Sequence, residues 1–485
     1  MSTKQIATST LWQIASQCVM AALSILTVKF VAMGLSKELF GNYNSAYGYL
    51  QLFGILADFG LYAIAVREVS RAHDRAKVLG VLIVLRSIIL MLSLVSALLI
   101  VWLMPMWKGT PLPLGVSIAA FVPFFTLLAG ILRTIFQVNY KMHYVFVAEV
   151  AQRILTAGLI GWIILLGVRE TTDLTVYHQF LGIGGAGAAL LFLISLIAGS
   201  RFMKIRPTWD PVLLKKITRT AAPYGLAFLF MAFYRQFDVT MIAFLRPDFE
   251  VQNAYYGPVI RMMDMAFLLP TFLLNSVLPI VSERDAKGED TRTVLGKTFL
   301  LILLLGIIAA AFSFLWSRPL IELLTTTDYL STSERPGSDT ALQLLALPMF
   351  LNGIILFSFY ALLTRHAWQP LVLVLAGAAV LSIVLNALLI PLYGFVGASI
   401  TSIAVNAVLA PTLLFFSGKT LPFDVPFSAL ARVLLFAGLL AVMLLALQPF
   451  ASDSLKTILL LCVATGMMGI LGIVTGLPQA LGLRK

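Results

Sequence analysis

Two apolar stretches of the sequence each carry an arginine followed three residues later by an aspartate. The first pair is Arg235 and Asp238, and the second is Arg261 and Asp264. A spacing of three residues places both side chains on one face of a helix. The planar fork of donors on arginine suits a phosphate group, so the two arginines are candidates for binding an anion. The aspartates are candidates for pairing with them or for holding a coupling cation.

Six further ionisable residues interrupt apolar stretches in the same way. Glu149 and Arg153 are spaced i,i+4, which suits either an ion pair that clamps the helix or a functional site. Lys29 and Arg133 lie near the ends of their stretches, where long side chains can reach water. The full set is Lys29, Asp58, Arg86, Arg133, Glu149, Arg153, Arg235, Asp238, Arg261 and Asp264. Six cations against four anions predict a cavity that prefers an amphipathic anion such as a lipid phosphate.

Asp58 begins an Asp-Phe-Gly triplet, the sequence with which protein kinases hold magnesium. A kinase also needs a glycine-rich loop between a strand and a helix, and a His-Arg-Asp catalytic loop. The one G-x-G-x-x-G, at 182–187, lies in an uninterrupted apolar stretch, and no His-Arg-Asp occurs. The kinase interpretation is therefore excluded. Asp58 is expected either to pair with an arginine of the same bundle, with Arg86 as the candidate, or to take up a coupling cation.

The composition decides what kind of element must position these charges. Of 485 residues, 60% are hydrophobic and only 12% are charged, against roughly 25% charged in soluble domains. A mean hydropathy of +0.96 is too high for a fold that must cover itself with polar surface in water. The sequence predicts an all-α integral membrane protein. Its two cysteines, Cys18 and Cys462, both fall in apolar segments, so no disulfide framework is expected.

Apolar stretches long enough to cross about 30 Å of hydrocarbon predict fourteen spans. They lie near 10–33, 43–66, 79–104, 112–139, 143–167, 177–199, 219–244, 254–281, 293–316, 340–364, 369–390, 394–416, 428–448 and 457–477. With the N-terminus inside, the inner segments carry twenty lysines and arginines and the outer ones seven. This bias predicts that both termini are cytoplasmic, and that the first span is retained rather than cleaved. Orientation and contact with membrane lipids also explain the net charge of +12, so no nucleic-acid partner is expected.

A weak internal repeat organises the spans. The segment 35–50 resembles 245–260 at a shift of 209, which aligns Lys37 with Arg246 and Phe40 with Phe249. The repeat predicts two pseudo-symmetric six-helix lobes running in the same direction, an arrangement suited to alternating access. The expected divisions are an N-lobe at 1–200, a basic cytoplasmic linker at 201–218, a C-lobe at 219–417, and two extra spans at 418–485.

Nothing in the sequence predicts an energy-coupling cofactor. The "SGKT" at 417–420 resembles the end of a P-loop, but the required glycine is replaced by Leu413. His73, His143, His178 and His366 are scattered without metal-ligand spacing. We expect no metal, no cofactor and no enzymatic activity, so that any transport is driven by an ion gradient or runs downhill.

Two motifs resemble a known family. The segment 35–71, "LSKELFGNYNSAYGYLQLFGILADFGLYAIAVREVSR", resembles the start of oligosaccharide flippases of the polysaccharide transporter family, in the MOP superfamily. In that family an outer F-G-x-Y turn leads into a helix ending L-x-D-x-G-L. The segment 386–408, "NALLIPLYGFVGASITSIAVNAV", is similar to the family's N-x-x-L-I-P-x-x-G-x-x-G-A hairpin. With fourteen spans and two lobes, the resemblance covers essentially the whole chain.

The resemblance implies a Wzx-like flippase that moves undecaprenyl-diphosphate-linked oligosaccharide across the bacterial inner membrane for O-antigen, capsule or exopolysaccharide synthesis. It also implies a cationic cavity for the diphosphate, which Arg86, Arg153, Arg235 and Arg261 would line, with Asp58, Glu149, Asp238 and Asp264 as charge partners or ion-coupling groups. The two extra spans would hold the polyprenyl tail. Implied partners are a coupling H⁺ or Na⁺ and the polysaccharide polymerase machinery. The alternatives are a lipid II flippase, or a MATE-like ion-coupled exporter of drugs or small metabolites.

Overall fold

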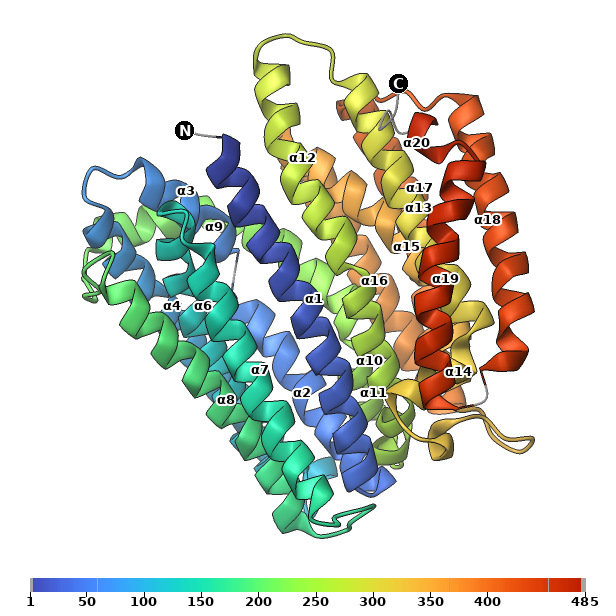
Figure 1. Ribbon diagram of the computed structural model, residues 1–485. Helices are drawn as coiled ribbons and strands as arrows, with labels where there is room; N and C mark the ends of the chain where they lie inside the picture. The colour runs from blue at the N-terminus through green and yellow to red at the C-terminus, as the bar shows by residue number, and fades with distance from the viewer. Residues whose placement is uncertain (1–2, 59, 366, 452, 481–485) are drawn as a thin grey trace. The chain divides into compact units, whose positions relative to one another are not determined.

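The computed structural model describes residues 3–58, 60–365, 367–451 and 453–480, and every regular element in this part of the chain is a helix (Figure 1). The elements are α1 (Thr3–Gly34), α2 (Lys37–Asp58), α3 (Leu61–Arg71), α4 (Arg75–Leu103), η1 (Pro105–Trp107), α5 (Leu112–Ala119), α6 (Phe121–Val138), α7 (Met142–Leu165), α8 (Leu174–Ser200), α9 (Pro211–Gln236), α10 (Asp238–Leu245), α11 (Phe249–Ala266), α12 (Leu268–Ala286), α13 (Arg292–Leu315), α14 (Ser317–Leu324), η2 (Thr327–Tyr329), α15 (Ser338–Thr364), α16 (Trp368–Tyr393), α17 (Phe395–Thr420), α18 (Phe427–Leu447), η3 (Gln448–Phe450), α19 (Ser454–Val474) and α20 (Leu477–Ala480). The expected all-α membrane fold is confirmed.

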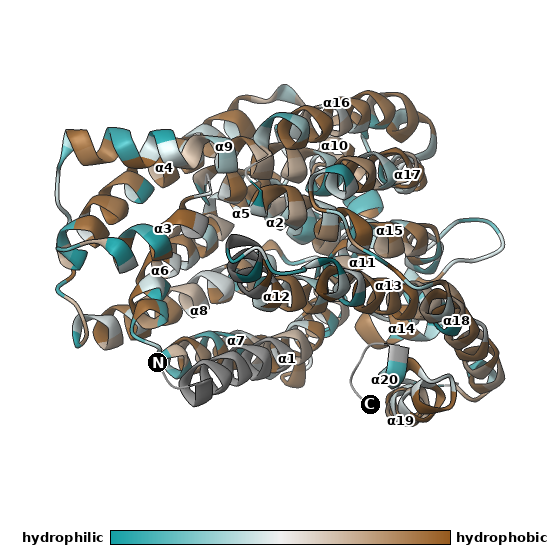
Figure 2. Cartoon of the chain, turned by 90° about the horizontal axis from the view of Figure 1, so that it is seen from above, coloured by the Kyte–Doolittle hydropathy of each residue, from teal (hydrophilic) through white to brown (hydrophobic). Residues whose placement is uncertain are grey.

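The helices account for the expected spans. Among the described residues, eleven helices are long and apolar enough to cross a membrane, or twelve if the bent pair α9 and α10 is one span. The first expected span corresponds to α1, of which only Val19–Gly34 enters that test, and the second to α2 followed by α3. Fourteen is therefore an approximate count. Most of the ribbon in each unit is hydrophobic, with hydrophilic residues concentrated in the connections (Figure 2).

Aspartates begin several of these helices. Asp74, Asp173, Asp210 and Asp453 each precede a helix and accept a hydrogen bond from a backbone N–H of its first turn. Such a cap satisfies one of the four N–H groups that a helix start leaves without a partner, and the carboxylate complements the positive end of the helix dipole. At α9 the cap is followed by Pro211, whose missing N–H costs nothing at the first helical position. The local sequence thus fixes where the helices begin.

The chain divides into two compact units, Met1–Gly257 and Pro258–Lys485. In the first unit, α7 packs against α1 and α8, α8 packs against α6, and α2 packs against α4, α9 and α10. In the second unit, α15 packs against α13 and α17, α16 packs against α17, and α18 covers α13. The four-part division at 200, 218 and 417 stays a prediction.

Candidate functional site

The candidate site in the first unit lies beside a break between two helices. Helix α2 ends at Asp58, and α3 begins at Leu61 after Gly60. Gly60 has φ of +67°, and a Cβ there would come within 2.7 Å of the Tyr224 side chain and 3.0 Å of the Gly225 backbone N on α9. Only glycine combines this backbone conformation with so close a neighbour. The chain is thereby redirected directly after the Asp58 carboxylate.

Arg86 on α4 meets that carboxylate. Its Nη1 lies 2.5 Å from Asp58 Oδ1, and the Arg86 side chain is only 4% exposed while that of Asp58 is 32% exposed. A buried guanidinium without a countercharge would be strongly destabilising, so Asp58 is the group that allows Arg86 to lie inside the bundle. The ion pair that the sequence suggested between these two residues is present.

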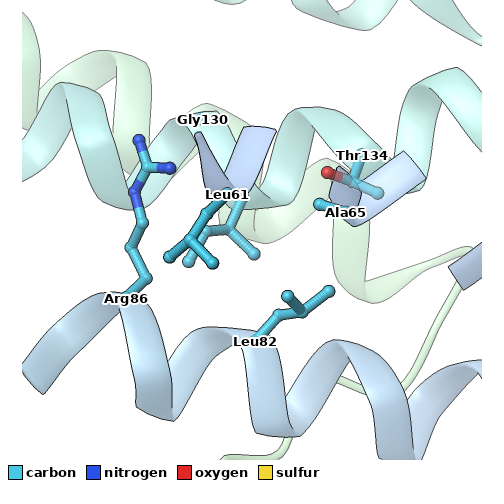
Figure 3. Close-up of a pocket in the computed structure, with 7 residues that line it drawn as sticks. Leu61, Ala65, Leu82, Arg86, Gly130 and Thr134 are labelled. Atoms are coloured by element: carbon cyan, nitrogen blue, oxygen red, sulfur yellow. The ribbon is translucent and has the colours of Figure 1, made fainter. Parts of the chain in front are cut away.

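A small pocket continues from the guanidinium into the bundle (Figure 3). Arg86 and Leu82 on α4 face Gly130 and Thr134 on α6, with Leu61 of α3 between them. The Nε of Arg86 and the Oγ1 of Thr134 are both buried without a hydrogen-bond partner. The pocket has room for about one water molecule, which could satisfy both atoms. It is too small for a diphosphate or a sugar, so this pocket is a structural feature of the ion pair and not a transport cavity.

A second ion pair crosses from α6 to α7. Arg133 Nη1 donates to Glu149 Oε1 at 2.9 Å, and their side chains are 25% and 13% exposed. The sequence suggested that Arg133 reaches water and that Glu149 pairs with Arg153 one turn away on the same helix. The structure gives Glu149 an interhelical partner in Arg133, which sequence spacing alone does not reveal. Arg153 lies on α7 and is half-buried.

The seventh expected span, 219–244, is a bent pair of helices. Helix α9 ends at Gln236 and α10 begins at Asp238, with a bend of 57° between them. Arg235 therefore stands in the last turn of one helix and Asp238 in the first turn of the next. A carboxylate at a helix start is favourable because it faces the positive end of the helix dipole. Periodicity could not show this bend, because both halves are apolar.

Asp238 is held by a residue that sequence reasoning missed. Asp238 is only 3% exposed, and Tyr256 Oη on α11 donates to its Oδ2 at 2.9 Å. Tyr256 and Gly257 repeat Tyr47 and Gly48 at the shift of 209, which was the available signal. The other expected pair, Arg261 and Asp264, lies further along α11 in the second compact unit, and both residues are half-buried.

Comparison with known proteins identifies the family of this chain. A family model described as polysaccharide biosynthesis protein matches residues 6–257, more than half of the chain. The chain belongs to this polysaccharide biosynthesis protein family. Among curated proteins, no sequence matches it.

Solved structures show the same fold at low sequence identity. A lipid II flippase MurJ in an inward closed conformation has a TM-score of 0.68 at 16% identity, covering 96% of this chain and 98% of that one. An inward-facing multidrug resistance MATE family transporter of the MOP superfamily has a TM-score of 0.63 at 13% identity, covering 84% and 97%. A mutant of the Vibrio cholerae MATE transporter VcmN has a TM-score of 0.56 at 12% identity, covering 86% and 96%. This polysaccharide biosynthesis family member is thus a multi-pass membrane protein with the fold of flippase-type transporters.

Proposed function

We propose that the protein is a flippase that moves undecaprenyl-diphosphate-linked oligosaccharide from the inner to the outer leaflet of the bacterial inner membrane, with both of its termini in the cytoplasm. The observation that carries this proposal is the match of residues 6–257 to a polysaccharide biosynthesis family on a chain with a transporter fold. Polysaccharide repeat units are built on lipid carriers, so a transporter in that pathway needs a lipid-linked glycan as its substrate.

The charged residues suit such a substrate. Four arginines, Arg86, Arg153, Arg235 and Arg261, stand in membrane-spanning helices, and a diphosphate accepts the paired hydrogen bonds that a guanidinium offers. Arg86 already forms an ion pair with Asp58. In the proposal, Arg86 either leaves Asp58 to bind the diphosphate or stabilises the helix bundle. Arg235 and Arg261 are the proposed diphosphate ligands, with Asp238 and Asp264 as charge partners or acceptors for a coupling H⁺ or Na⁺.

The last two long helices suit the polyprenyl tail. Only 11% of the most apolar window of α19 and 28% of that of α18 are buried within the protein. Exposed residues of α19 include Leu455, Leu459, Ile470 and Val474. A surface this apolar is compatible with acyl or isoprenoid chains and not with water. We propose that the tail stays against this surface while the polar head moves through the protein as the lobes rock about the 201–218 linker.

The experiment that tests the proposal is deletion of the gene in its host, followed by extraction and mass spectrometry of the lipid-linked sugars. Accumulation of undecaprenyl-diphosphate oligosaccharide together with loss of surface polymer supports the flippase, and the mass identifies the glycan. Accumulation of lipid II supports the lipid II flippase instead. Unchanged lipids with retention of cationic dyes support the MATE-like exporter. Complementation by the intact gene is the control in each case.

A further inference from the structure

The segment 201–210, which joins α8 to α9, is packed against the first compact unit. Its Met203 and Ile205 side chains pack on an apolar cluster that α3, α4, α6 and α9 form. The backbone carbonyl of Arg206 crosses α4 at Gly80, where a Cβ would overlap it. We call this segment the inner strap, because the sequence predicts that it lies on the cytoplasmic side of the membrane. Its backbone is held in place, so its exposed side chains present a defined surface.

The exposed side of the inner strap and of the first turns of α9 carries one sign of charge. Five cations are exposed there, namely Arg201, Lys204, Arg206, Lys215 and Lys216. The one acid between 201 and 216 is Asp210, which already caps α9 and pairs with Lys77. In the part of the chain that the structure describes, none of the five cations forms an ion pair. The surface therefore has positive charge to offer to an anionic partner.

Two large apolar side chains stand on the same surface. Trp209 is 66% exposed and Val212 is 81% exposed. Val212 lies three and four residues before Lys215 and Lys216, so these three side chains share one face of α9. An exposed indole is favourable at a membrane interface, which accommodates both its apolar ring and its N–H. Orientation in the membrane explains the sign of the charge on this segment, but it does not explain the exposed tryptophan.

The contact with α4 sets the depth of the inner strap. Lys77 Nζ donates to Asp210 Oδ2 at 2.8 Å, and the α4 span is expected to begin two residues further on, at 79. At about 1.5 Å per residue, Asp210 and the neighbouring Trp209 then lie about 3 Å outside the hydrocarbon. Headgroups occupy about 5–7 Å on each side of a bilayer. Trp209 is therefore expected at the level of the lipid headgroups.

The second unit repeats this construction. The segment 421–426 joins α17 to α18, and the carbonyl of Asp424 crosses α13 at Gly296, where a Cβ would overlap it. Phe427 follows this segment and is 84% exposed, and the exposed Lys297 follows the glycine. The glycine explains how a backbone can cross the helix, but not why an exposed ring and a cation accompany the crossing in both units. Their recurrence favours a partner that every membrane-spanning unit meets, namely lipid.

We propose that the inner strap, together with the first turns of α9, is a docking surface for the acidic phospholipids of the cytoplasmic leaflet. The lysines and arginines bind the lipid phosphates, and Trp209 inserts between the headgroups. Each cation close to an acidic leaflet strengthens the attraction about fivefold. The proposal does not depend on which molecule the protein transports, because the strap binds lipid of the surrounding bilayer.

The test places the full-length protein in lipid nanodiscs, whose two faces are both open to water. The nanodiscs contain phosphatidylcholine alone or an equal mixture with phosphatidylglycerol. The reporter is bimane on P207C in the C18A/C462A background, because Pro207 is an exposed residue of the strap. Docking should lower quenching by the neutral reagent acrylamide by a factor of roughly three or more when phosphatidylglycerol is present. Equally strong quenching in both lipids would leave the strap open to water, as a face for a soluble protein would be, and would overturn the proposal.

Three variants of the reporter separate docking from net charge. K215Q/K216Q should remove the protection, since two lost cations weaken the attraction roughly 25-fold, and W209A should weaken it without a change in charge. The matched control R284Q/K287Q removes two exposed cations from the end of α12 and the residue after it, and it should stay protected. Equal loss in the two double variants would show that net charge alone acts, and would overturn the docking surface. Each variant must elute as a single species.

Discussion

Trp107 and Trp316 are separated by 209 residues and make the same hydrogen bond in their respective units. Trp107 Nε1 donates to the Ala243 carbonyl on α10 at 2.9 Å, and Trp316 Nε1 donates to the Leu444 carbonyl on α18 at 2.8 Å. Both indoles are fully buried. Helix α18 thus takes the place against the second repeat copy that α10 takes against the first. The thirteenth expected span thus packs against the second repeat copy.

Replacing Trp316 by Phe should destabilise the second unit. The ring volume is largely retained, but the indole hydrogen bond to the Leu444 carbonyl is lost. The cost should be about 0.5–1.5 kcal/mol, because this carbonyl still accepts the Gln448 N–H. We expect a lower melting temperature in detergent, and the same for W107F in the first unit. Trp162, which is 61% exposed, supplies the control W162F, which should melt like the wild type. Equal melting of W316F and W162F would show that the indole hydrogen bond contributes nothing.

Asp58 and Arg86 should respond unequally to substitution. D58A leaves a buried guanidinium without its countercharge, which typically costs about 3–5 kcal/mol. R86M leaves a carboxylate that is one-third exposed and can be hydrated, so its cost should be clearly smaller. The double variant should be more stable than D58A alone. Chemical denaturation of the three variants in one detergent measures this coupling, and additive effects would contradict a direct ion pair.

The sequence was sufficient to predict the membrane spans, but not the points at which a span bends or is interrupted. Uninterrupted apolar stretches identify membrane helices because the bilayer demands them. The bend of 57° after Gln236 carries no compositional mark. The φ of +67° at Gly60 accompanies a close approach to the α9 backbone, and this tertiary contact is not visible in the sequence.

The same contrast applies to the charged residues. The pairing of Asp58 with Arg86 could be proposed because both charges interrupt apolar stretches of neighbouring expected spans. The partners Arg133 for Glu149 and Tyr256 for Asp238 depend on how the helices are rotated about their axes. One sequence does not fix that rotation when a helix is apolar on all sides.

The ion pair between Asp210, which precedes α9, and Lys77 on α4 should be lost in acid. Lys77 on α4 donates to Asp210 at 2.8 Å, and this hydrogen bond, with that from the Leu213 N–H, lowers the pKa of Asp210. The folded-state pKa of Asp210 lies below the unfolded value of about 3.9. The contribution of this carboxylate to stability is therefore complete above roughly pH 4 and is lost as the pH falls through the folded-state pKa. The pKa of Asp210, followed by NMR of its side-chain carboxyl, should lie below about 3.9 in the wild type and should rise toward that value when K77M removes the Lys77 ammonium. K456M, which removes the partner of Asp453, should leave the pKa of Asp210 unchanged.

Arg235 and Arg261 should be needed together for transport. In the proposed mechanism each guanidinium binds one phosphate of the diphosphate, so R235A/R261A should lose translocation while the protein still accumulates in the membrane. The measurement is complementation of the deletion strain, with surface polymer as the readout and immunoblotting for the protein level. Arg219 lies exposed near the start of the same helix as Arg235, so R219A is the matched control and should complement fully. Normal polymer in cells that express the double variant would rule out these arginines as the diphosphate ligands.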